Sequence, residues 1–113
     1  MSEKWAKLAS LLVSKTQKGE LKWEETSNSD TYQVVVGKNA IEIEQTGFGD
    51  DFEVRVRDGS GKVVDSFDDH TVNQITGLNY SRALNEMFSL IRRQISGSEK
   101  VLDDLLGELE KDP

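Results

Sequence analysis

The side chains in this sequence best suited to chemistry form an acidic run beside the single histidine. Asp65, Asp68 and Asp69 come just before His70. Carboxylates beside an imidazole can bind a divalent metal ion or act as an acid–base pair. Loop neighbours converge on one point only if the fold makes them, and a second histidine for a typical zinc site is missing. We therefore interpret residues 68–77 as a solvated connector. A metal- or small-ligand-binding domain, or a weak enzyme, that uses Asp68–His70 remains an alternative.

The glycine-containing motifs are turns rather than cofactor sites. Asp58-Gly-Ser-Gly-Lys62 has Val56 and Val63 where a phosphate-binding Walker loop needs glycine and Ser or Thr, and Lys62 occupies a ligand position of an EF-hand. Gly47-Phe-Gly49 lacks the third glycine of a dinucleotide fingerprint. No serine lies in a G-x-S-x-G elbow. We expect no catalytic residues, no bound metal and no cofactor, so the chain is not predicted to be an enzyme.

Composition narrows the class of partner. The chain has 113 residues, with 21 acids against 14 bases, a net charge of -7 and no cysteine. This charge repels phosphate backbones, so we expect no nucleic-acid partner. Without cysteine there are no disulfides and no thiol chemistry. The short N-terminal apolar run is interrupted by lysines, so we expect no signal peptide, no membrane contact and a cytoplasmic location.

The stretch Asp51–Phe67 organises the predicted fold. Phe52, Val54 and Val56 alternate with charged residues, which is typical of a half-buried strand, and the Asp58–Gly61 turn leads into a second strand. Such a hairpin needs further strands or a helix over its apolar face.

The rest of the chain supplies both. An amphipathic helix carrying Trp5, Leu8 and Leu12 is capped by Ser2 and ends at Gly19. Further strands are predicted at residues 21–24, 32–36 and 41–44, and a turn at residues 47–50 precedes the hairpin. A long amphipathic helix runs from a cap at Asn79 to Gly97. We predict an α+β fold in residues 1–97, a five-stranded antiparallel meander with both helices on one face. Trp5 and Trp23 should both be largely buried.

Residues 98–113 form an acidic amphipathic tail. Val101, Leu102, Leu105, Leu106 and Leu109 recur at helical spacing. The segment is too short to be a stable helix alone, so it should dock on the domain or pair with a second chain. A self-associating subunit that forms a homodimer through this tail is therefore another alternative.

The passage from helix to first strand resembles the opening of many small uncharacterised bacterial proteins. The residues that carry the resemblance are Leu11, Leu12, Thr16, Gly19, Leu21, Trp23 and Thr26. It covers the first quarter of the chain and implies a bacterial or phage-linked accessory protein, with no activity to transfer.

The outward face of the sheet is the predicted partner-binding surface, because two helices can cover only one face. It combines acidic side chains with exposed valines, a mixture suited to docking a protein. The residues predicted to bind the partner are Glu42, Glu44, Glu53, Arg55, Arg57 and Val35. We expect these charges to matter for binding and hardly for folding. The predicted function is a small acidic protein-binding module of the inhibitor, immunity or adaptor type.

Overall fold

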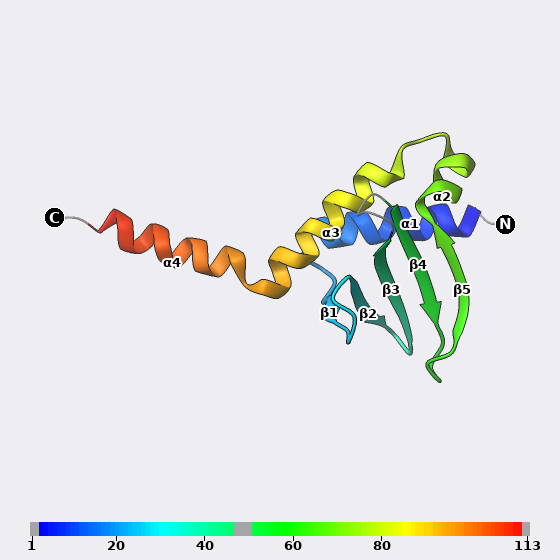
Figure 1. Ribbon diagram of the computed structural model, residues 1–113, viewed down its shortest axis with the longest axis horizontal. Helices are drawn as coiled ribbons and strands as arrows, with labels where there is room; N and C mark the ends of the chain where they lie inside the picture. The colour runs from blue at the N-terminus through cyan, green and yellow to red at the C-terminus, as the bar shows by residue number, and fades with distance from the viewer. Residues whose placement is uncertain (1–2, 47–50, 112–113) are drawn as a thin grey trace.

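The computed structural model describes residues 3–46 and 51–111 and has the predicted α+β fold. Its helices are α1 (Glu3–Gln17), α2 (Asp69–Thr76), α3 (Tyr80–Ser96) and α4 (Ser98–Glu110). Its strands are β1 (Glu24–Glu25), β2 (Thr31–Val36), β3 (Asn39–Thr46), β4 (Asp51–Arg57) and β5 (Val63–Asp68). Helices α1 and α3 contact each other and lie on the same side of the sheet (Figure 1). The expected Ser2 cap and the turn at residues 47–50 lie outside the described residues.

The sheet is a meander in which each strand pairs antiparallel with the next, in the order β1-β2-β3-β4-β5. Side chains alternate between the two faces of each strand. The row that faces the helices is buried and consists of Tyr32, Ile43, Val54 and Phe67. The next row faces away and is polar, with Gln33, Glu42, Arg55 and Ser66. The alternation read from the sequence therefore sets which face forms the core.

Aromatic side chains join the helices to the sheet. The ring of Phe88 in α3 packs 5.1 Å from Tyr32 and 5.6 Å from Phe52, measured between centroids. Trp5 in α1 stacks on Phe67 at 5.5 Å, and its Nε1 donates a 2.8 Å hydrogen bond to Oδ2 of Asp65. Trp5 is only partly buried, so the prediction of two largely buried tryptophans is correct for Trp23 alone. The reason is that Trp5 lies over the β5 edge of the sheet.

The first strand is shorter and later than predicted. Leu21 and Trp23 precede β1, which pairs with β2 only through Glu24 and Glu25. The chain leaves α1 at Gly19, whose φ of 72° is in the left-handed region. Trp23 is then held beneath the end of α1, where it is buried. Alternation in this segment therefore reflects burial against a helix rather than pairing in the sheet.

The predicted irregular connector is instead the helix α2. Asp68 caps its start, with Oδ1 accepting a 2.8 Å hydrogen bond from the backbone N–H of Thr71, and Gly77 ends it with a φ of 71°. Gly97 ends α3 in the same way, as predicted. Asn79 precedes α3, but its side chain makes no capping bond, and Asn73 in α2 accepts from the Tyr80 N–H instead.

Helix α4 leads away from the rest of the molecule (Figure 1) and contributes to a longest dimension of 62 Å. It packs against the end of α3, directly before it in the chain. None of its residues is buried. Within residues 3–46 and 51–111, no helix is long and apolar enough to cross a membrane.

Candidate protein-binding surfaces

Arg55 lies at the centre of the open face of the sheet and bonds to three glutamates. Its Nε lies 3.2 Å from Oε1 of Glu42, and its Nη1 lies 2.7 Å from Oε1 of Glu44 and 2.6 Å from Oε1 of Glu53. Arg57 Nε lies 3.1 Å from the same oxygen of Glu42. The register explains the cluster, because Glu42 lies opposite Arg55, and Glu44 lies opposite Glu53.

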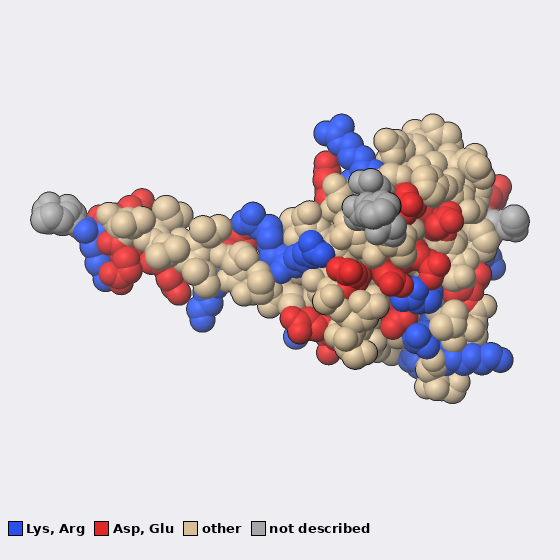
Figure 2. Space-filling view, in the orientation of Figure 1, with Lys and Arg blue, Asp and Glu red and all other residues tan. Residues whose placement is uncertain are grey.

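The cluster holds three carboxylates against two guanidinium groups and is partly withdrawn from water. Partial burial acts to lower the pKa of Arg55, but the hydrogen bonds that Arg55 donates to Glu44, Glu53 and Glu42 outweigh it and raise that pKa. Glu42 is buried although it lies on the open face. Figure 2 shows acidic side chains over the sheet with basic ones directly beside them. Two arginines thus offset most of the negative charge of the three glutamates on this face.

Five of the six predicted partner-binding residues therefore come together, namely Glu42, Glu44, Glu53, Arg55 and Arg57. Val35 lies elsewhere, opposite Ala40 near the end of β2, and is exposed. We expected these charges hardly to affect folding, but the contacts of Arg55 give a reason to expect a contribution from this residue. Arg55 binds three carboxylates at once, so the charges depend on one another within the folded protein.

The acidic–histidine run also forms a cluster, but with a different membership from the one predicted. The ligand atoms of Asp51, Asp69 and His70 lie within 4.8 Å of one another. His70 Nε2 pairs with Asp51 Oδ1 at 2.8 Å. Asp69 is fully buried and accepts hydrogen bonds from the Phe52 N–H at 3.2 Å and from the Ser81 hydroxyl. Each of the three groups already has a protein partner.

Asp69 contradicts the interpretation of this segment as a solvated connector. Its carboxylate ties β4 to α3 from the first residue of α2. The signals for α2 were present in the sequence, because Asp68 is a good N-cap and Gly77 a good C-terminal stop. The burial of Asp69 has no such local signal.

The pKa values of Asp68 and His70 are shifted by their hydrogen bonds and by nearby charges within the protein. Hydrogen bonds from the Thr71 N–H and hydroxyl lower the pKa of Asp68. The hydrogen bond to Asp51, followed by the charge of Asp69, raises the pKa of His70. The cluster therefore favours a protonated His70 paired with a carboxylate.

The Asp58–Lys62 loop is a turn, as the sequence indicated. Oδ1 of Asp58 accepts from the Ser60 hydroxyl at 2.6 Å, and from the N–H groups of Ser60 and Lys62 at 2.9 and 3.1 Å. These bonds, those from Ser60 foremost, lower the pKa of Asp58. They occupy the donors that a phosphate would need.

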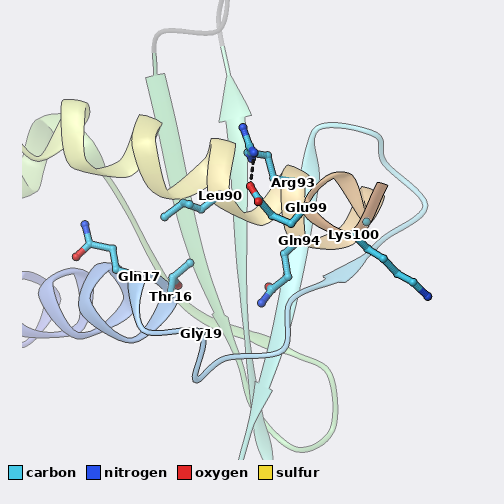
Figure 3. Close-up of a pocket in the computed structure, with 9 residues that line it drawn as sticks. Thr16, Gln17, Gly19, Leu90, Arg93, Gln94, Glu99 and Lys100 are labelled. Carbon is cyan, nitrogen blue, oxygen red and sulfur yellow. Dashed lines mark hydrogen bonds and ion pairs between the residues drawn. The ribbon is translucent and has the colours of Figure 1, made fainter. Parts of the chain in front are cut away.

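Arg92 and Arg93, near the end of α3, bind groups of this chain. The Arg92 guanidinium lies 4.9 Å above the Phe88 ring and 3.6 Å from Asp30. Arg93 pairs with Glu99 in the first turn of α4. Arg93 and Glu99, drawn as sticks in Figure 3, line a hollow of about 400 Å³ between the ends of α1 and α3 and the start of α4. The pair connects α4 to the domain on one side.

Helix α4 has an apolar face that is exposed to solvent. Its five large side chains are between 45% and 79% exposed: Val101, Leu102, Leu105, Leu106 and Leu109. At 100° per residue they occupy an arc of about 140° on one side of the helix. Sequence reasoning found this stripe but left open whether it docks on its own domain, and in the structure it does not.

No family model, curated protein or solved structure matches this chain.

Proposed function

We propose that this chain is a small acidic protein-binding module of the inhibitor, immunity or adaptor type. It acts by surface complementarity and does not catalyse a reaction. Its principal docking element is α4, which presents a leucine face to solvent.

The exposure of that face is the observation that supports this proposal. Fully burying a leucine or valine side chain contributes about 1.5–3 kcal/mol. A helix of 13 residues is marginal on its own in water, and α4 has no buried residue to stabilise it. A partner surface would supply both the burial and the support. Exposed apolar stripes rimmed by charged residues commonly mark protein-interaction sites.

The sheet face has a secondary role in this proposal. Glu42, Glu44, Glu53, Arg55 and Arg57 satisfy one another, so a partner would gain little from a single new ion pair there. Val35 is exposed farther along β2, apart from this cluster. These six residues would contribute complementarity around a contact made elsewhere.

The metal-binding alternative has weaker support. Asp51, Asp69 and His70 offer three ligand atoms, but a metal ion would have to displace the His70–Asp51 pair. The hydrogen bonds that Asp69 accepts from Phe52 and Ser81 would compete with the metal ion as well. We propose a structural role for this cluster.

Site-specific photo-crosslinking in cells tests the docking role of α4. A photoreactive amino acid replaces Leu105, in the apolar face, and in a matched variant it replaces Lys100, on the opposite side of the same helix. We expect a covalent protein adduct from position 105 and much less from position 100. A third variant carries the probe at Val35. Adducts from Val35 but not from position 105 would move the site to the sheet, and equal labelling at 100 and 105 would contradict a specific helix face.

A further inference from the structure

A line of basic side chains runs along the outer face of α1. It consists of exposed residues: Lys4, Lys7, Leu11 and Lys15 in α1, and Lys18 directly after the helix. At 100° per residue, the four helical positions fall within an arc of about 80°. We call these five residues the lysine stripe. The buried residues of α1, among them Ala9 and Leu12, lie on the other side. Within the described ranges, only Lys15 of the stripe forms an ion pair, with Glu20 at 3.4 Å.

An apolar hollow adjoins the lysine stripe. It has a volume of about 160 Å³ and is lined by Leu8, Leu11, Leu21 and Val36, with Lys15 the charged residue at its edge. Leu11 is 46% exposed and Val36 is 48% exposed. This surface therefore combines an uncovered apolar depression with a positive border.

Helix α4 has the complementary composition. Its apolar face is bordered on one side by Asp104 and Glu108, one turn apart, and on the other by Glu99, Asp103 and Glu110. Residues 98–110 carry these five acids against Lys100 alone, whereas residues 3–18 carry four lysines against Glu3. An acid-bordered apolar helix thus matches a lysine-bordered apolar surface in both respects.

The length and the direction of α4 also fit the lysine stripe of a second molecule. Helix α4 has 13 residues, a length of about 20 Å, and the stripe from Lys4 to Lys18 spans about 21 Å. The start of α4 lies beside the C-terminal end of α1, because Thr16 and Gln17 line the same hollow as Glu99 and Lys100 (Figure 3). From there α4 points away from its own α1 (Figure 1). It can reach only the stripe of another molecule.

Building on the docking role proposed for α4, we propose that its partner is a second copy of this chain. Two molecules exchange their α4 helices, and each leucine face covers the lysine stripe and the apolar hollow of the other molecule. The contact is reciprocal about a two-fold axis, so it closes at a dimer. Direct pairing of α4 with α4 is disfavoured, because it brings two acidic borders together along a short helix.

Charge-reversed chains test this exchange by sedimentation equilibrium. One variant reverses the stripe (Lys7→Glu with Lys15→Glu), and another reverses the helix border (Asp104→Lys with Glu108→Lys). We expect the dimer dissociation constant of each variant alone to rise at least tenfold, because each variant replaces several attractions between the helix and the stripe with repulsions. An equimolar mixture should dimerise about as well as the wild type, because every helix then meets a stripe of opposite charge.

A control variant reverses two exposed cations on other surfaces, Lys62→Glu with Arg82→Glu, and should leave the dissociation constant unchanged. Circular dichroism melts confirm that every variant is folded. A tighter dimer for the helix-border variant alone would overturn the exchange and indicate α4–α4 pairing. A mixture that stays monomeric, or a wild-type chain that is monomeric at all concentrations, would also overturn it. A monomer that still crosslinks through position 105 to a different protein would overturn the exchange and leave the docking role of α4 standing.

Discussion

The indole Nε1 of Trp23 donates a 3.0 Å hydrogen bond to Oγ1 of Thr16, in the buried space between the end of α1 and the first strand. Both residues lie within one stretch of the chain that reverses direction at Gly19. The hydroxyl gives the indole N–H a partner that it would otherwise lack, since water is excluded there. This bond holds the helix-to-sheet passage in place.

Replacing the Thr16 hydroxyl should therefore destabilise the protein. Thr16→Val keeps the shape of the side chain but leaves a buried N–H without an acceptor, which costs about 1–3 kcal/mol. Thr16→Ser keeps the acceptor and should cost less. Urea unfolding followed by tryptophan fluorescence measures both. Equal losses for the two variants would mean that the hydrogen bond contributes nothing beyond the methyl group.

Asp69 should be among the polar residues most important for stability. Asp69→Ala leaves the Phe52 N–H and the Ser81 hydroxyl without their acceptor, and bonds to a charged group contribute about 1.5–3 kcal/mol each. We expect a loss of about 3 kcal/mol in thermal or chemical unfolding. Asp69→Asn should lose less, because its amide can still accept from one group and donate to the hydroxyl. A near-wild-type alanine variant would contradict this role.

Arg55 should stabilise the open face more than its neighbour does. Arg55→Ala leaves three carboxylates close together, one of them on the buried Glu42, and should cost about 2 kcal/mol after allowance for partial exposure. Arg57→Ala is the comparison, since it removes one ion pair and one exposed hydrogen bond to the Gly61 carbonyl, and should cost less than about 1 kcal/mol. Unfolding in urea at low and high salt compares them. Equal effects would show that Arg55 has no special place in the cluster.

Reversing Glu42, Glu44 and Glu53 to lysine together surrounds Arg55 with like charge. We expect this variant to be less stable than Arg55→Ala. Its melting temperature must therefore be known before any loss of binding is attributed to the face. A melt close to that of the wild type would mean that the cluster is relaxed easily by solvent.

The ion pair of His70 predicts a pH-dependent contribution to stability. Asp51 raises the pKa of His70 above its ordinary 6.5, with help from the charges of Asp69 and Asp68. Because the folded value exceeds the unfolded one, the stabilisation is complete below about pH 6.5 and is lost as the pH rises through the folded pKa. The difference in unfolding free energy between wild type and His70→Gln should therefore shrink as the pH rises above about 6.5.

Asp51→Asn provides the control for this titration. In that background the largest cause of the pKa shift is removed, so the pH dependence of the His70→Gln difference should flatten. Nuclear magnetic resonance of the imidazole measures the pKa directly. A His70 pKa at or below 6.5 in the wild type would contradict the pairing.

Much of the fold could be predicted from the sequence, because the signals are local. Alternation of Phe52, Val54 and Val56 assigns one face of β4 to the core, whatever the rest of the chain does. Helical spacing of Leu84, Phe88 and Ile91 does the same for α3, and tight turns then favour a meander. Helical spacing likewise predicted the apolar face of α4, formed by residues 101–109.

Tertiary structure decided the features that depend on distant partners. Leu21 and Trp23 alternate like a strand, but burial beneath α1 keeps them outside the sheet. Asp69 has the same local character as Asp68, and only the N–H of Phe52 and the hydroxyl of Ser81 make one of them a buried acceptor. No pattern along the chain specifies such a convergence, because its partners come from separate elements.

The open face of the sheet and α4 also combine features that the sequence predicted with features that the tertiary structure decided. The sequence determined that Glu42, Glu44 and Glu53 share a face with Arg55, since side-chain direction follows from strand periodicity. The strand register decided that one guanidinium binds all three carboxylates. Periodicity also determined that α4 has an apolar side. The direction in which the chain leaves Gly97 decided that this side meets solvent rather than the α1–α3 layer, because a helix of fixed length can cover only the surface toward which it points.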